Sequence, residues 1–375
     1  MKQLFYKNLP EHTVLSLIAP TASGKTDLAF LLYDTGRFEL ISVDSALIYR
    51  DMNIGTAKPT TQELTQYPHH LVNIIDPTQS YSVANFVNDV KHLIYQSHQR
   101  GKIPLLVGGS MMYYMALFDG LSAVPETQAH IRAQVMDWLS EQGIGDLYAY
   151  LKSHDPVICQ RLRASDTQRI TRAVEVHLQT GVPMSVWQST PKTALCHNKD
   201  QYWLALSVEP DRAWLHQRIE QRLELMWQAG FVDEVMALIQ TYPLSPDMPS
   251  MRCVGYRQVL EFLIAQHYVV QDNTNLERNL SKRLPFCRLS VAIGATNVLN
   301  GSQKTTNKPC QDMKNKALYA TRQLAKRQST WQRQLLSLNH KPTIIDTSQE
   351  ALLHHISPVI VSFDSIKQVK HQLLS

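Results

Sequence analysis

Short apolar runs alternate with amphipathic stretches over the first 120 residues of the chain. We expect strands at the apolar runs Val14–Ile18, Leu40–Val43, Leu71–Ile75 and Ile103–Val107. Between the last two runs, apolar residues recur at helical spacing from Val83 to Ile94, and Gly101 supplies a stop signal. Strands that alternate with helices predict a doubly wound parallel sheet, which binds ligands at the carboxyl ends of its strands.

The pattern becomes helical after residue 124. It stays helical to about Gln188, an apolar strand-like run follows at Tyr202–Val208, and further helices are expected at 212–238, 256–264 and 317–336. The polar segment 273–309 is interpreted as an extended loop or partly ordered insertion. A last apolar run, Thr343–Asp346, precedes a helix. We therefore predict a first core part at 1–124, a helical insertion at 125–190, a second core part at 191–346 and a helical tail at 347–375.

The turn after the first predicted strand reads A-P-T-A-S-G-K-T. A strand, a Gly-Lys-Thr turn and a helix together align backbone N–H groups on a phosphate, with the lysine supplying charge and the threonine hydroxyl binding Mg²⁺. The sequence thus predicts a P-loop NTPase-like α/β core whose phosphate site consists of Ala19, Pro20, Thr21, Ala22, Ser23, Gly24, Lys25 and Thr26. Ala19 stands where such loops usually have glycine, and it fits if the turn needs an ordinary φ there.

Composition and charge limit the partners and the compartment that we expect for this protein. The formal net charge is +5, and between Arg278 and Lys316 eight basic residues face a single acid. This excess indicates either a polyanionic partner such as a nucleic acid or a solvated basic surface. The five cysteines form no C-x-x-C pair, which favours reduced thiols. With no long apolar run and no leader pattern, we expect a cytoplasmic protein that binds no membrane and acts as a monomer.

Polar residues follow two of the predicted strands. Asp44, after the second strand, could cap the next helix, bind Mg²⁺ or accept a proton, and its place beside the phosphate site favours the chemical roles. The run Ile103–Val107 ends in Gly108-Gly109-Ser110, without the metal-binding acid of a P-loop ATPase. The two glycines suit either a closely approaching ligand or a tight turn.

Two basic segments lie farther along the chain. Arg218 and Arg222 share a helix face at a spacing of four residues, which suits either a diphosphate clamp or a solvated, salt-bridged face. Arg252 and Arg257 bracket a glycine turn. Neither segment is diagnostic by itself.

Together these segments resemble the bacterial tRNA dimethylallyltransferase (tRNA isopentenyltransferase) family. The resemblance rests on A-P-T-A-S-G-K-T, D-S-A-L-I-Y-R-D-M-N-I-G-T-A-K-P, P-L-L-V-G-G-S, Q-R-I-T-R-A-V-E-V, R-C-V-G-Y-R-Q and A-T-R-Q-L-A-K-R-Q-S-T-W, and it covers most of residues 12–335. The chain departs from the family at Ala19, at Ser110, where threonine is usual, and in the added basic segment 273–309.

The resemblance implies transfer of a dimethylallyl group from dimethylallyl diphosphate to N6 of the adenosine 3′ of the anticodon, at position 37, in tRNAs that read codons beginning with U. The product is N6-isopentenyladenosine. It implies Asp44 as the general base, with Ser110, Arg218 and Arg222 as further catalytic residues and Mg²⁺ held through Thr26 as the cofactor. The leaving diphosphate would occupy the phosphate site, which in this family is also assigned to ATP.

The resemblance also implies contacts with the anticodon stem-loop, which the helical insertion would grip. The contact residues it maps onto this chain are Asp44, Ser45, Ala46, Leu47, Ser110, Arg132, Gln168, Arg169, Ile170, Thr171, Arg172, Arg252, Cys253, Val254, Gly255, Tyr256, Arg257, Thr321, Arg322, Gln323, Leu324, Ala325, Lys326, Arg327 and Gln328. Apart from the resemblance, a P-loop kinase of a small metabolite remains the main alternative, and it differs by requiring ATP turnover.

Overall fold

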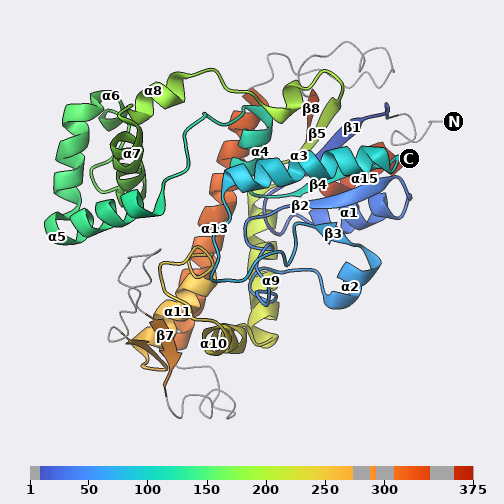
Figure 1. The fold of residues 1–375 in the computed structure, drawn as a ribbon. Helices are drawn as coiled ribbons and strands as arrows, with labels where there is room; N and C mark the ends of the chain where they lie inside the picture. Colours follow the sequence, from blue (N-terminus) through green and yellow to red (C-terminus); the bar gives the residue numbers. More distant parts are fainter. Residues whose placement is uncertain (1–8, 273–287, 293–307, 338–358, 375) are drawn as a thin grey trace. The chain divides into compact units, whose positions relative to one another are not determined.

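A six-stranded parallel sheet carries the first predicted motif (Figure 1). The computed structural model describes residues 9–272, 288–292, 308–337 and 359–374. The sheet order is β3-β2-β4-β1-β5-β8, and the expected α/β class is confirmed. The strands are β1 (Thr13–Ile18), β2 (Phe38–Val43), β3 (His69–His70), β4 (Ile103–Gly108), β5 (Tyr202–Val208) and β8 (Val359–Phe363).

Alternate residues of the central strands enter two separate cores. Val14, Ile41 and Leu106 pack with the helices α3 (Val83–Gln99) and α4 (Met111–Phe118). Leu15 and Leu40 pack on the opposite face with α1 (Lys25–Tyr33), and α15 (Ile366–Leu374) contributes to this second core. Because side chains alternate across a strand and both faces are covered, the strands read as continuous apolar runs.

The third predicted strand is misplaced. Leu71–Ile75 forms turns and bends, and the strand beside it is the two-residue β3. Leu71 and Asn73 have φ values of 62° and 56°, in the left-handed region that an extended strand excludes. Only Ile75 retains a single parallel bridge, to Tyr49. The strand was predicted from apolar content alone. Apolar side chains can also pack from turns and bends, so this content does not require a strand.

Two helices of the second half, α9 and α13, contact the turn that follows β1. The predicted stretch 212–238 is two helices, α9 (Arg212–Gln228) and α10 (Phe231–Thr241), separated at Gly230, whose φ is 91°. The others are α2 (Thr61–Gln66), η2 (Leu195–His197), α11 (Tyr256–Ala265) and α13 (Lys308–Ser337). α13 packs against α4, α9 and α11. Through α4, this helix returns the chain to the first part of the core.

Two expectations for irregular or helical segments need correction. Within 273–309, the described residues include β7 (Arg288–Val291), which pairs with β6 (Val269–Asp272), and Lys308 already begins α13. The tail expected to be helical contains the edge strand β8, because Val359–Phe363 finds an open parallel partner in β5. Most of the basic segment and the predicted run Thr343–Asp346 lie outside the described residues.

Residues Gly120–Thr193 belong to a second compact unit, which is helical. Its helices are α5 (Ala129–His154), α6 (Pro156–Cys159), α7 (Thr167–Thr180) and α8 (Met184–Ser189). Val135, Leu147 and Val174 are fully buried in a core that belongs to this unit alone. Across the described parts of both units, no helix has the length and apolar character needed to span a membrane.

Candidate functional site

The P-loop occupies the turn between β1 and α1. Gly24 caps the helix with a φ of 87°, and Ala22 also lies in the left-handed region with a φ of 63°. Ala19 has no such φ, so alanine is compatible with the backbone where glycine is usual. The hydroxyl of Ser23 is buried without a hydrogen-bond partner among the described residues. The helix N-terminus and this hydroxyl together provide donors for an anion.

Two cations and one carboxylate converge beside this loop. Burial of the amino group lowers the pKa of Lys25 to about 8, with Asp44 opposing this shift and Arg222 adding to it. Burial also lowers the pKa of Arg222, again against the attraction of Asp44. Lys25 begins α1 beside the loop, Arg222 donates to Thr21 of the loop, and the charge of Asp44 acts on both cations. Asp44, Lys25 and Arg222 are therefore brought into one site by the sheet and α9.

The two arginines of α9 bind the P-loop itself. Arg218 Nε donates to the carbonyl oxygen of Ala22 at 3.1 Å, and Arg222 Nη2 donates to Thr21 Oγ1 at 2.5 Å. The Arg218 guanidinium also lies 5.2 Å from the centroid of the Trp214 ring. Arg218 is exposed and Arg222 is half-buried, and both hydrogen-bond to the loop, whereas the diphosphate clamp stays a prediction. The arginines add positive charge where phosphate is expected.

Asp44 caps a turn rather than the helix that its sequence context allowed, because residues 45–48 form turns. Its Oδ1 accepts hydrogen bonds from the backbone N–H groups of Ala46 and Leu47, at 2.8 and 3.4 Å. The Ser110 hydroxyl accepts from the Ser45 N–H at 2.9 Å, which joins the ends of β2 and β4. The cap fixes the carboxylate beside Lys25 and Arg222, so capping and chemistry are compatible here.

The paired glycines after β4 accommodate protein groups. A Cβ at Gly108 would lie 1.9 Å from the carbonyl oxygen of Val43, and one at Gly109 would lie 2.6 Å from Gln328 Nε2. Gln328 accepts from the Thr21 N–H at 3.0 Å and donates to the Gly109 carbonyl at 2.8 Å. The close approach expected of a ligand is thus made by a neighbouring strand and by α13.

The other core segments mapped as RNA contacts divide into exposed and buried residues. Arg252, Arg257, Lys326 and Arg327 are exposed, and they suit contact with phosphate. Gly255 and the side chains of Tyr256, Thr321 and Ala325 are buried, so they support the exposed members of their segments. Burial raises the pKa of the Cys253 thiol to about 12, and the charge of Asp44 adds to this shift. Arg322 pairs with Glu220 at 3.0 Å.

The mapped residues of the helical unit divide in the same way. Arg132 and Arg172 each lie 3.8 Å from the buried carboxylate of Glu175, and Arg172 Nη2 also donates to the Pro125 carbonyl at 2.8 Å. Gln168 and Arg169 are exposed, whereas Ile170 and Thr171 are buried. Arg172 therefore holds this unit together, and Gln168 and Arg169 present polar groups to solvent.

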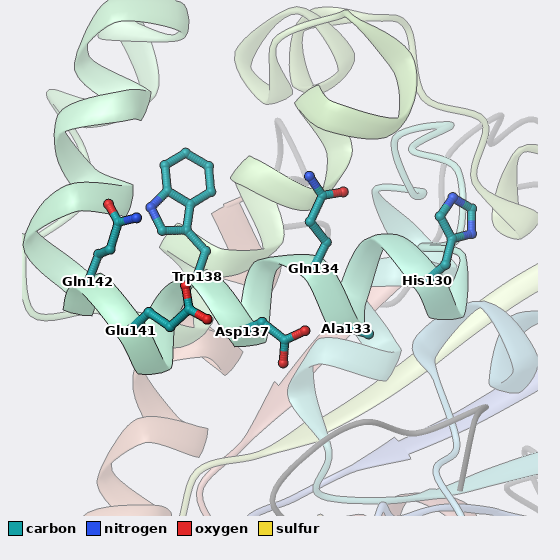
Figure 2. Close-up of a pocket in the computed structure, with 7 residues that line it drawn as sticks. All are labelled: His130, Ala133, Gln134, Asp137, Trp138, Glu141 and Gln142. Atoms are coloured by element: carbon teal, nitrogen blue, oxygen red, sulfur yellow. The ribbon is translucent and has the colours of Figure 1, made fainter. Parts of the chain in front are cut away.

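A pocket on α5 does not fit the predicted chemistry. Figure 2 shows Asp137 and Glu141 on the helix that also carries His130, Gln134 and Trp138. The Trp138 indole N–H donates to Asp146 at 2.6 Å. Carboxylates in the lining repel phosphate, so we assign no site to this pocket.

The described residues contain no group of three or more His, Cys, Asp or Glu side chains that could hold a metal ion. Thr26, in the first turn of α1, offers a hydroxyl next to Lys25. Mg²⁺ commonly takes few protein ligands and completes its shell with phosphate oxygens and water. A Mg²⁺ ion delivered with a diphosphate fits this donor set.

Two residues that the sequence did not single out organise the loop after β2. Lys58 is buried and donates to the Tyr49 carbonyl, Asn53 Oδ1 and Asn73 Oδ1, at 2.6, 3.1 and 2.7 Å. Glu234, from α10, accepts hydrogen bonds from backbone N–H groups of the same loop. Lys58 stands within a motif of the chain, but no sequence signal marked Glu234, because its partners are backbone atoms about 180 residues away.

Gln328 is predicted to support diphosphate binding through its two hydrogen bonds. Gln328→Met retains the side-chain length but loses both bonds, and it should weaken binding of inorganic diphosphate with Mg²⁺ roughly tenfold. Isothermal titration calorimetry measures the effect. Gln334→Met, at an exposed position of the same helix, is the control and should bind as the wild type does. Equal affinities for both variants would contradict the role of Gln328.

Known proteins resemble this chain over most of its length. A family model described as IPP transferase matches residues 47–335. The tRNA dimethylallyltransferase of Psychrobacter sp. strain PRwf-1 is 58% identical over 367 residues, covering 98% of this chain and 96% of that protein. The tRNA dimethylallyltransferase of Acinetobacter baumannii strain ATCC 17978 is 44% identical over 337 residues, covering 90% and 95% of the two chains.

Solved structures share the fold. A full-length tRNA isopentenylpyrophosphate transferase from Bacillus halodurans aligns with a TM-score of 0.54 and 24% identity, covering 96% of this chain and 94% of its own. A eukaryotic dimethylallyltransferase acting on tRNA aligns with a TM-score of 0.61 and 22% identity, covering 85% and 69%. Family model and close relatives extend over most of the sequence. The chain therefore belongs to the IPP transferase family.

Proposed function

We propose that this prenyl-transferring enzyme moves the dimethylallyl group of dimethylallyl diphosphate to N6 of the adenosine at position 37, next to the anticodon, in tRNAs that read codons beginning with U. The product is N6-isopentenyladenosine. The observation that carries the proposal is the pair of cations at the P-loop, Lys25 at the start of α1 and Arg222 hydrogen-bonded to Thr21, on both of which the charge of Asp44 acts. A carboxylate beside fixed cations can accept a proton while the cations stabilise a departing anion.

The nucleophile needs the carboxylate. The lone pair of the adenine amine is delocalised into the ring, so removal of a proton as the N–C bond forms assists attack. Oδ1 of Asp44 caps the turn at Ala46. We assign the proton to Oδ2 of the same group. As N6 bonds to the allylic carbon, the C–O bond to diphosphate breaks and the N6 proton passes to Asp44.

The leaving group needs the cations. Negative charge grows on the bridging oxygen of diphosphate as the C–O bond lengthens. A cation about 4 Å away contributes roughly 4 kcal/mol at an effective dielectric near 20, and preorganised groups contribute without reorganising. Lys25, Arg222 and the N–H groups that begin α1 supply this stabilisation, and Arg218 holds the loop through Ala22. Mg²⁺ held through Thr26 would neutralise further charge on the diphosphate.

The RNA partner is the tRNA anticodon stem-loop, and we propose that the enzyme meets it as a monomer in the cytoplasm. The target base must leave its stack to reach Asp44. The loop that begins at Asp44, the 252–257 segment and the exposed cations of α13 would contact RNA from the core, and Gln168 and Arg169 from the helical unit. Specificity would come from splayed loop bases.

One assay separates prenyl transfer from the kinase alternative. The protein is incubated with dimethylallyl diphosphate, Mg²⁺ and unmodified tRNA whose anticodon loop contains an A-A-A run, and a parallel sample receives ATP. Mass spectrometry should show one added prenyl group on the adenosine, with no ATP turnover. ATP hydrolysis or phosphoryl transfer without prenylation would overturn the proposal.

A further inference from the structure

Glu234 binds two segments that are far apart in the sequence. Its Oε2 accepts hydrogen bonds from the N–H groups of Asn53 and Ile54, at 3.0 and 2.6 Å. Its Oε1 accepts from the N–H of Gly55 at 3.1 Å and from the Tyr256 hydroxyl at 2.6 Å. One carboxylate thus joins the loop after β2 to the first residue of α11.

The chemistry of this joint favours a charged side chain. Successive backbone N–H groups that point to one spot form an anion-binding concavity, and here the chain fills it with its own carboxylate. Hydrogen bonds to an ionised acceptor are about twice as strong as neutral ones. Burial and the neighbouring carboxylate both raise the pKa of Tyr256, so its hydroxyl stays a donor.

The packing around the joint leaves no room for a side chain at residue 55. A Cβ at Gly55 would lie 2.1 Å from the Phe231 ring and 2.6 Å from the Tyr256 ring. These two rings are themselves packed edge to face, with centroids 4.9 Å apart. The Gly55 backbone can therefore approach Glu234 only because it carries no side chain.

The loop held by Glu234 is continuous with the turn at Asp44. Leu47 and Ile48 accept backbone hydrogen bonds from Asn73 and Ile74, at 3.1 and 2.9 Å. Lys58 then closes the loop onto Tyr49. At the other side of the joint, the Tyr256 segment includes Cys253, whose pKa responds to Asp44. The loop that follows Asp44 and the 252–257 segment are thus joined directly at Glu234.

We propose that Glu234 is a positioning residue that sets the register between the Asp44 loop and the 252–257 segment, and thereby the presentation of the target adenosine to Asp44. This inference rests on the proposed function. Glu234 acts through the backbone of residues 53–55 and through Tyr256, without touching the P-loop. Its loss should therefore impair the use of RNA and leave diphosphate binding intact.

The test is Glu234→Gln in the full-length chain. The amide of glutamine has the same shape as the carboxylate, but only one of its two polar atoms accepts hydrogen bonds. Its NH2 group would face donors whose hydrogen bonds the second carboxylate oxygen now accepts. We expect kcat/KM for tRNA to fall about 10- to 100-fold, with the Kd of inorganic diphosphate with Mg²⁺ within about twofold of wild type. Asp233→Asn is the matched control, because it removes the same charge from the same turn of α10 at an exposed position.

A second variant tests whether the loss in Glu234→Gln comes from this hydrogen-bonded carboxylate or from a general loss of structure. Tyr256→Phe removes one of the four donors, should cost only a few-fold, and should add little to Glu234→Gln because both act on the same carboxylate. A wild-type kcat/KM for tRNA in Glu234→Gln, or an equal loss of diphosphate affinity, would overturn the inference. If the wild type itself fails to prenylate tRNA, the proposed function fails, and the inference is judged by the Kd of the anticodon stem-loop, which must rise in Glu234→Gln alone.

Discussion

Replacing Asp44 with asparagine lowers prenyl transfer by about 10²–10⁴-fold and leaves tRNA affinity within a few-fold of wild type. The amide oxygen of asparagine can still accept from the N–H groups of Ala46 and Leu47, so the turn persists. It cannot accept the N6 proton. Single-turnover prenylation with saturating tRNA measures the chemical step, and filter binding of the same tRNA measures affinity.

Asp44→Ala is the informative comparison. Alanine removes the base and the cap together. Asp44→Ala should therefore lose as much prenyl transfer as Asp44→Asn does, and it should also bind tRNA more weakly. Unchanged turnover in Asp44→Asn would remove Asp44 as the base. If Asp44→Asn were fully active and Asp44→Ala had low activity, Asp44 would act only as a cap.

Replacing Lys25 with methionine lowers transfer by about 10³-fold, the equivalent of the roughly 4 kcal/mol that one close cation contributes near an effective dielectric of 20. Methionine keeps the apolar part of the side chain, so the P-loop keeps its packing. Steady-state kinetics with dimethylallyl diphosphate measure the loss. Lys91→Met, at an exposed position of α3, is the control and should retain wild-type rates.

The lowered pKa of Lys25 predicts a pH dependence of diphosphate binding. Below about pH 8 the amine is protonated, and above it the free enzyme loses this charge. Because a bound anion favours the protonated amine, binding above pH 8 must take up a proton, and the Kd should rise by up to about tenfold per pH unit. Lys25→Arg stays charged, so the ratio of wild-type to variant Kd cancels the titration of diphosphate. A constant ratio between pH 7 and pH 9.5 would refute the assignment.

The strands next to the P-loop were predictable because both faces of the sheet are covered. β1, β4 and β5 differ from the predicted runs by at most one residue at either end. The strand predicted at Leu71–Ile75 failed because its backbone enters the left-handed region and its carbonyl and N–H groups bond to the loop at Ile48. β8 was missed because an edge strand needs only one partner, and β5 supplies it 151 residues earlier in the chain.

The candidate site shows the same division. The Gly-Lys-Thr turn and the acid at Asp44 are local signals, since a helix N-terminus and a strand end are made by neighbouring residues. The contacts of Arg218 and Arg222 could not be predicted from their spacing, because arginines on an exposed helix face and arginines that contact a P-loop have the same spacing in the sequence. The glycine at 109 suited the close approach of a ligand, but the Gln328 side chain occupies that space.

By itself, the sequence determined the α/β class, the place of the Gly-Lys-Thr turn between a strand and a helix, and the family, because these depend on residue spacing within short segments. Only the tertiary structure decided which side chains meet there. It directs Arg222 at Thr21, brings α13 onto the loop through Gln328, and sets Glu234 against residues 53–55. Each of these contacts joins groups about 180 to 310 residues apart. Burial then shifts the pKa of Lys25, which no local pattern records.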